Sequence, residues 1–127
     1  MSFPFNSKKG LILVTAEVEG PVGTLITRLA LDTGASTTLL STAVLVTLGY
    51  DPAASIERHQ VTTGSGVEFV PQVRITRFKA LGQERLHFPI LAHTLPPSAK
   101  VDGVVGLDFL RGLALTIDFR AGKLELI

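Results

Sequence analysis

The chain of 127 residues contains no cysteine. Disulfide bonds, cysteine-ligated metals and thiol nucleophiles are therefore excluded. A long apolar run is also missing from the N-terminal region: the run from Leu11 to Ala16 has six residues, and charge returns at Glu17 and Glu19. Such a run is too short for the core of a signal peptide or for a membrane-spanning helix. We therefore expect a cytoplasmic protein with no membrane partner.

Charge of one sign does not dominate, because 12 basic and 11 acidic residues leave a net charge of +1. The longest cationic cluster is Lys8-Lys9, far from the basic stripe that nucleic-acid binding needs. The three histidines, His59, His87 and His93, do not have the spacing of metal ligands on one element. We expect no nucleic-acid partner, no metal site and no cofactor.

Apolar residues, in contrast, are abundant: they make up 46% of the chain, and the mean hydropathy is +0.40. This composition argues against a disordered chain and predicts one domain with a core of its own. Short apolar runs alternate with turn signals at nearly regular spacing, which is typical of an all-β domain. We expect an N-terminal extension at residues 1–10 and the domain at residues 11–127.

The predicted elements follow a repeated order. Ser41 and Gly49 are good residues to begin and end a short helix at 42–48. The first third then reads as a hairpin, an apolar segment with a glycine turn, and a helix, and the last third reads the same way with a single helical turn. This order suggests two half-copies of one unit. The predicted strands are 11–18, 23–31, two within 57–70 around a Gly-Ser-Gly turn, 72–80, 84–93, and a last hairpin around residues 120–122.

The stretch LALDTGAST places Asp32 at the end of an apolar strand. Burial of an unpaired carboxylate is unfavourable, so such a position needs a reason. Gly34 permits a tight backbone, while the stiff side chain of Thr33 and the hydroxyl of Ser36 can hold local hydrogen bonds. The residues alone are compatible with a rigid turn that orients a catalytic carboxylate, and equally with an ordinary Asx-turn.

Two motifs carry a resemblance to a known family. LALDTGAS resembles the active-site signature of the aspartic proteases, and GVVGLDFL resembles the second hallmark of their single-domain, retropepsin-like members. The motifs lie about seventy residues apart, with a glycine-tipped hairpin between them. The resemblance covers the chain from about Leu11 to Ile127. It implies a retropepsin-like acid protease barrel, all-β, with one or two short helices and one lobe per chain.

The resemblance also implies the chemistry. Asp32 would be the catalytic residue, in an active-site turn with Thr33, Gly34, Ala35 and Ser36. Aspartic proteases use two carboxylates that share one proton, and this chain has one Asp-Thr-Gly sequence. The resemblance therefore implies a homodimer in which two copies of Asp32 meet on the two-fold axis, activate a water and hydrolyse a peptide or protein substrate.

Further roles are implied for two other segments. Thr63, Gly64, Ser65 and Gly66 resemble the tip of the flap that closes over substrate in this family. The second hallmark would supply the pocket wall. Val104 and Val105 would form this wall, and Gly106 would let the chain pass behind the active-site turn.

The sequence departs from the retroviral pattern at two positions. Retroviral members usually carry an Asp and an Arg that form an ion pair where this chain has Ser36 and Leu107. Both partners are missing together, which avoids an unpaired charge but puts the usual support of the dimer in doubt.

Two alternatives stay open at this point. One is a dimeric peptide-binding or interaction module with little or no hydrolysis on the same fold. The other is a monomeric β-domain in which Asp32 is only a turn residue. We interpret Asp102, Asp108 and Asp118 as structural residues, Asp108 because an acidic side chain suits the start of a helical turn.

Overall fold

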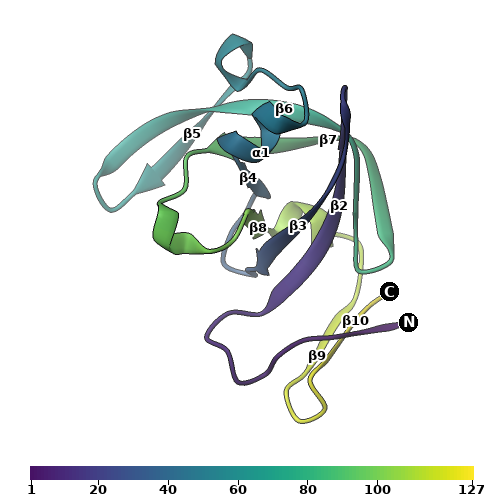
Figure 1. Cartoon of the computed structure of the whole chain (residues 1–127). Helices are drawn as coiled ribbons and strands as arrows, with labels where there is room; N and C mark the ends of the chain where they lie inside the picture. The colour runs from purple at the N-terminus through teal and green to yellow at the C-terminus, as the bar shows by residue number, and fades with distance from the viewer.

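The computed structural model describes the backbone of residues 1–127 and every side chain except those of Thr63 and Pro97. Ten strands carry most of the chain, with two short α-helices and two 3-10 turns between them (Figure 1). The elements in chain order are β1 (Ser2–Pro4), β2 (Leu13–Gly20), β3 (Gly23–Leu31), β4 (Leu39–Ser41), α1 (Thr42–Thr47), η1 (Pro52–Ala54), β5 (Arg58–Thr63), β6 (Gly66–Ala80), β7 (Gln83–His93), η2 (Pro97–Ala99), β8 (Gly103–Val105), α2 (Leu107–Leu110), β9 (Leu115–Asp118) and β10 (Lys123–Leu126).

Six strands close into a barrel. Their order is β2-β3-β8-β4-β7-β6, and an additional pairing between β2 and β6 joins the two ends. Strand β5 continues the order beyond β6 and lies outside the closed ring. The expected all-β barrel with two short helices is therefore confirmed. Closure removes the exposed strand edges that would otherwise invite pairing with other chains.

The barrel core follows from alternation along the strands. On β2, Val14, Ala16 and Val18 are buried, while the residues between them point outward. Phe78 and Phe109 lie at the centre, 5.3 Å apart between ring centroids in an edge-on arrangement. The apolar face of each strand thus sets its register, since a slip of one residue would turn that face to solvent.

Helix α1 has the signals that the sequence predicted. The side chain of Ser41 accepts a hydrogen bond from the backbone N–H of Val44, which caps the helix. Leu45 is its buried residue, and Gly49 adopts a φ of +93° just beyond the C-terminal end. The helix covers one side of the barrel next to β4 (Figure 1).

Strand β6 differs from the prediction. We expected separate strands at the end of the 57–70 hairpin and at 72–80, but β6 is one strand of 15 residues. Its first part pairs with β5 as far as the pair Arg58–Pro71, and its second part pairs with β7 from Gln72 onward. Pro71 lies at the point where β6 changes partner, a position where a strand tolerates the missing backbone N–H.

The strand pairing confirms the repeated order of elements. Strands β3 and β8 are parallel, β4 and β7 are parallel, and the pairs β4–β8 and β2–β6 are antiparallel. Exchanging β2, β3 and β4 with β6, β7 and β8 reproduces the same ring. The counterpart of β8 is therefore β4. From the sequence we had matched β8 to the apolar segment that ends at Asp32, and that match is wrong.

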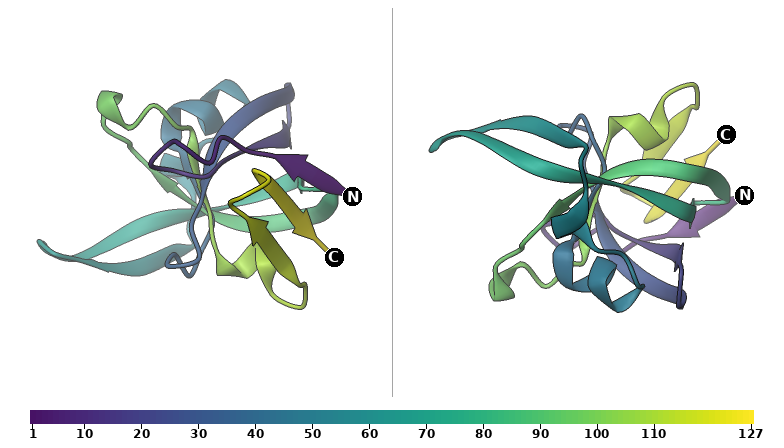
Figure 2. Two further views of the ribbon diagram at one scale, coloured as in Figure 1. Left: turned by 90° about the horizontal axis from the view of Figure 1, so that it is seen from below. Right: turned by 90° about the horizontal axis from the view of Figure 1, so that it is seen from above.

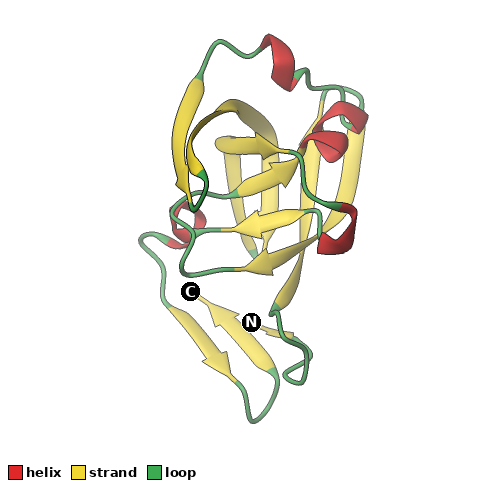
Figure 3. Cartoon of the chain, turned by 90° about the vertical axis from the view of Figure 1, so that its left-hand side faces the viewer, coloured by secondary structure: helices red, strands yellow, loops and turns green.

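A second, three-stranded sheet lies below the barrel and has the order β1-β10-β9 (Figure 3). Residues 2–4, within the stretch that we expected to be an extension, pair with residues 123–125. The two chain ends consequently lie near each other (Figures 1 and 2). The β9–β10 turn is held by Asp118, whose carboxylate accepts hydrogen bonds from the N–H groups of Arg120 and Ala121.

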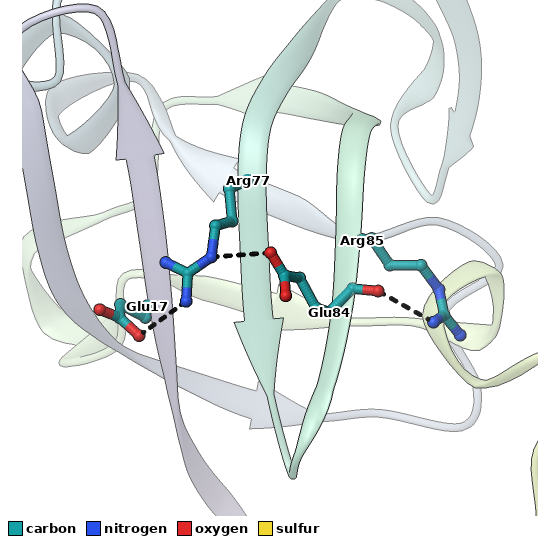
Figure 4. A network of polar contacts seen from close by, with 4 residues as sticks. All are labelled: Glu17, Arg77, Glu84 and Arg85. Atoms are coloured by element: carbon teal, nitrogen blue, oxygen red, sulfur yellow. Dashed lines mark hydrogen bonds and ion pairs between the residues drawn. The ribbon is translucent and has the colours of Figure 1, made fainter.

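Charged side chains cross the outer face where the barrel closes (Figure 4). Arg77 on β6 donates to Glu84 on β7 at 2.9 Å and lies 3.5 Å from Glu17 on β2. The hydrogen bond to Glu84, followed by the charge of Glu17, raises the pKa of Arg77 above its usual value. Arg85 reaches the other way and donates to the carbonyl oxygen of Phe109. Ion pairs this exposed add little stability.

Candidate functional site

Asp32 leaves the barrel at the end of β3. Leu29 and Ala30 before it are buried, and its own N–H donates to the carbonyl oxygen of Val105 on β8 at 3.0 Å. Asp32 itself is exposed, as are Thr33 and Gly34. The expectation of a buried carboxylate is therefore wrong for the single chain, because β3 carries the turn out of the core before the carboxylate is reached.

The turn fixes the direction of the carboxylate. Oδ1 of Asp32 accepts the N–H of Gly34 at 2.8 Å, and its carbonyl oxygen accepts the N–H of Ala35 at 3.2 Å. A Cβ at Gly34 would lie 3.1 Å from that Oδ1, so a larger residue would press on the carboxylate. The first of these bonds forms an ordinary Asx-turn, so the turn by itself does not distinguish a catalytic carboxylate from a structural one.

The second motif packs directly against this turn. The N–H of Leu107 donates to the carbonyl oxygen of Ala35 at 2.8 Å. A Cβ at Gly106 would lie 2.8 Å from the same oxygen, and a Cβ at Gly103 would lie 2.0 Å from the carbonyl oxygen of Leu39. Real Cβ atoms do not approach so closely. Both glycines therefore let β8 pass against the turn and β4.

Asp108 and Thr38 brace the two motifs to each other. The hydroxyl of Thr38 donates to Asp108 at 2.7 Å, and its backbone N–H donates to the same carboxylate at 2.9 Å. The N–H of Phe109 also donates to this carboxylate, and the N–H of Gly106 donates to the Thr38 hydroxyl. Thr38 is fully buried, so each of these groups needs its partner.

This brace was missed in the sequence. We interpreted Asp108 from its place in a helical turn and assigned no role to Thr38. Their contact was not predicted because the two residues lie 70 positions apart. The available signal was a second threonine just before the apolar pair Leu39-Leu40. The brace lies next to Ser36 and Leu107, the positions that lack the family's ion pair.

The carboxylates of Asp102 and Asp118 accept hydrogen bonds from backbone N–H groups. Asp102 accepts the N–H of Arg28 at 2.9 Å, while the N–H of Asp102 donates to the carbonyl oxygen of Arg28. Asp118 holds the β9–β10 turn described above. Both observations agree with the structural interpretation of these residues. Throughout the described part of the chain, no group of three or more His, Cys, Asp and Glu side chains could hold a metal ion.

A cleft of about 490 Å³ separates the turn from the β5–β6 hairpin, a volume within the range of ligand sites. The hairpin, which we call the flap, projects beyond the barrel (Figures 1 and 2). The lining residues come from the turn, from β4, from the flap and from the end of β7: Gly34, Ala35, Ser36, Thr37, Leu39, His59, Gln60, Val61, Thr62, Val70, Leu91 and His93.

The predicted flap tip lies at the end of that hairpin. Thr63 pairs with Gly66, so Gly64 and Ser65 form the turn, and Gly66 has a φ of +131°. The side chain of Thr63 lies outside the described residues.

The two predicted wall residues lie on opposite faces of β8. Val105 is fully buried in the core, while Val104 on the opposite face of β8 is half-buried. Within the described residues neither belongs to the cleft lining. Gly106 does contact the turn, as described above.

Comparison with known proteins identifies the family and the fold of the chain. Its sequence matches the aspartyl protease family over residues 14–109. A retropepsin-like aspartic protease from Rickettsia conorii has a similar crystal structure, with a TM-score of 0.73 and 19% sequence identity over 99% of this chain and 88% of that one. That likeness establishes the fold. No curated protein matches in sequence. In the described part of the chain, no helix has the length and apolar character needed to span a membrane. Because the family match covers most of its length, the chain belongs to the aspartyl protease family.

Proposed function

We propose that the chain is an aspartic endopeptidase that acts as a homodimer. The observation that carries this proposal is one exposed, hydrogen-bonded Asp-Thr-Gly turn, braced from behind by the second motif and open to a cleft in front. Family membership supports the reaction class. The need for two carboxylates supports the dimer, since each chain has one such turn.

In the proposed reaction, the two copies of Asp32 share one proton. The ionised carboxylate takes a proton from a water whose oxygen attacks the peptide carbonyl carbon, while the other carboxyl gives its proton to the carbonyl oxygen. The tetrahedral intermediate then returns one hydroxyl proton to the pair as the pair protonates the leaving nitrogen, and the C–N bond breaks. The pair ends with one proton, as it began.

The substrate is an extended peptide that lies between the flap and the turn. An extended chain can add backbone hydrogen bonds to both walls of such a cleft, as in other cases of strand addition. The apolar side chains of Leu39, Val61 and Val70 in the cleft lining favour apolar substrate residues. Val104 is the member of the predicted wall pair whose side chain points away from the core, and a second copy of the chain would complete the wall around it.

The direct test is hydrolysis of a peptide library by purified protein with Asp32→Asn as the variant. Asparagine keeps an oxygen that can accept the Gly34 N–H, so the turn should stay folded while activity falls at least about 10³-fold. Asp51→Asn is the matched control, because Asp51 is exposed and its side chain makes no cap hydrogen bond. Unchanged activity in Asp32→Asn would exclude the proposed chemistry.

The alternative function gives a different result in the same assay. A dimeric peptide-binding module would retain library peptides without cleaving them, and Asp32→Asn would not change what it retains. A monomeric domain would show no self-association by sedimentation at high protein concentration.

A further inference from the structure

The flap and the barrel separate at one fork. Strand β6 pairs with β7 as far as Gln72–Leu91, then turns away and pairs with β5 to form the flap. Beyond this point β7 continues to His93, while β6 carries Glu68 in the flap. In Figure 1 the flap projects to the left, and the green segment that follows β7 lies below it.

One ion pair spans this fork. Nε2 of His93 lies 3.7 Å from Oε2 of Glu68, and Nδ1 of His93 lies 2.9 Å from the carbonyl oxygen of Thr94. The His93 side chain is 34% exposed and that of Glu68 is 54% exposed, so the pair forms at the mouth of the cleft. Glu68 lies opposite Val61 and on the same face as Val70, both of which line the cleft.

The hydrogen bond to Thr94 decides what Nε2 can do. A carbonyl oxygen can only accept, so Nδ1 must carry a hydrogen for this bond to form. In the neutral ring the other nitrogen then has a lone pair and no hydrogen. A neutral His93 consequently turns a lone pair toward the Glu68 carboxylate, whereas a protonated His93 presents an N–H and a positive charge to it.

We propose that Glu68 and His93 form a proton-dependent latch that holds the flap over the cleft. The proposal rests on the proposed function, because it assigns both residues as positioning residues of that site. The latch needs the N–H that only the protonated ring of His93 presents to the Glu68 carboxylate. Imidazole side chains ordinarily titrate between about pH 5 and pH 8, so the latch favours flap closure on the acidic side.

Other polar and charged groups lie on the elements next to the latch. His59 lines the same cleft from β5, and residues 34–37, which follow Asp32 in the turn, line it from the barrel side. Strand β4 presents Ser41 opposite His93. Lys100 and Asp102, from the segment after β7, line a separate hollow together with Thr94. A positive charge on His59 would disfavour a positive charge on His93 in the same cleft. The test therefore includes a His59 variant.

Hydrogen exchange of residues 58–70 measures the latch without catalysis. It is followed in the Asp32→Asn protein, and Glu68→Gln is compared with the parent at the same pH so that the intrinsic exchange rate cancels. At pH 5 we expect flap amides to exchange about two- to five-fold faster in Glu68→Gln, the range for a partly exposed ion pair. At pH 8 the two proteins should exchange equally.

Two variants separate the latch from a structural effect. His93→Lys keeps a cation at every pH in this range, so flap protection should lose its pH dependence. His59→Gln should leave the pH-dependent difference between parent and Glu68→Gln in place. In the active protein, Glu68→Gln should raise KM more than it lowers kcat at pH 5, because an unlatched flap weakens substrate retention.

The outcomes distinguish this proposal from the proposed function. Equal exchange of parent and Glu68→Gln at pH 5, or a difference of the same size at pH 8, would overturn the latch. If the latch is seen but no peptide is cleaved, the proposed function falls and the proton-dependent flap contact stands. If peptides are cleaved and no pH-dependent difference is found, the latch alone is rejected.

Discussion

The Asp-Thr-Gly turn and the flap face each other across one cleft but are held in different ways. The turn is held from behind by β8, by the Thr38–Asp108 brace and by glycines that leave no room for a Cβ. The flap is a two-stranded ribbon joined to the barrel through β6, and its contact with the end of β7 is a partly exposed ion pair. A catalytic group needs fixed placement, whereas a cover over substrate has to move. Rigidity is therefore concentrated where the chemistry is proposed.

The largest effect on stability should come from a glycine that packs β8 against β4, behind the turn. Gly103→Ala would place a Cβ 2.0 Å from a backbone oxygen of β4, and we expect a loss of at least about 4 kcal/mol in the free energy of unfolding. Gly10→Ala is the control, since a Cβ there meets nothing within 4 Å. Thermal unfolding and yield of folded protein measure both. A Gly103→Ala protein as stable as Gly10→Ala would contradict the described packing of β8.

Loss of the brace should come next. Asp108→Ala removes the acceptor of the Thr38 and Phe109 N–H groups, and we expect about 3 kcal/mol of destabilisation by chemical denaturation. Activity should also fall about tenfold or more, because a turn that shifts misplaces the carboxylate. Asp108→Asn keeps an acceptor oxygen and should lose less on both measures. Equal losses for the two variants would indicate that negative charge, rather than hydrogen bonding, is what matters there.

Substitution of two buried threonines should have smaller effects on stability, and the two can be compared directly. Thr38→Val and Thr27→Val each remove one buried hydroxyl, and each should reduce the free energy of unfolding by about 1–2 kcal/mol. Thr27 lies within β3 and donates to the carbonyl oxygen of Ala16, so its loss should leave kcat unchanged. Only Thr38→Val should lower kcat, since it alone loosens the turn. Equal kcat values would show that the brace has no part in catalysis.

The smallest effect on global stability should come from the flap. Gly66 has a φ of +131°, so Gly66→Ala carries about 1–3 kcal/mol of local strain. The flap can relieve that strain by opening locally, so we expect little change in the melting temperature and a lower kcat/KM. A fall in melting temperature as large as that of Gly103→Ala would show that the flap is part of the cooperative core.

Local signals in the sequence predicted much of this structure. The end of β3 just before Asp32, the Ser41 cap of α1 and the Gly64–Ser65 turn all depend on residues within a few positions of each other. The all-β class and the repeated order followed from alternation and turn spacing. These features are encoded locally, which is why one sequence suffices to predict them.

Features that depend on distant partners were not predicted. The brace joins Thr38 to Asp108, β1 pairs with β10 at the opposite end of the chain, and the exposure of Asp32 depends on how far the barrel extends. Val105 was expected in the pocket wall, but its side chain points into the core because of the register of β8 against β3. Such contacts leave no local pattern, since each partner alone is an ordinary strand or turn residue.

The proposed function requires one site that is built from two copies of Asp32. The most direct test is the binding stoichiometry, by native mass spectrometry and calorimetry, of a peptide that carries a hydroxyl in place of the scissile carbonyl, because such a compound mimics the tetrahedral state. We predict one inhibitor per two chains, with binding lost in Asp32→Asn and kept in Asp51→Asn. One inhibitor per single chain, or binding that survives Asp32→Asn unchanged, would contradict a site shared by two chains.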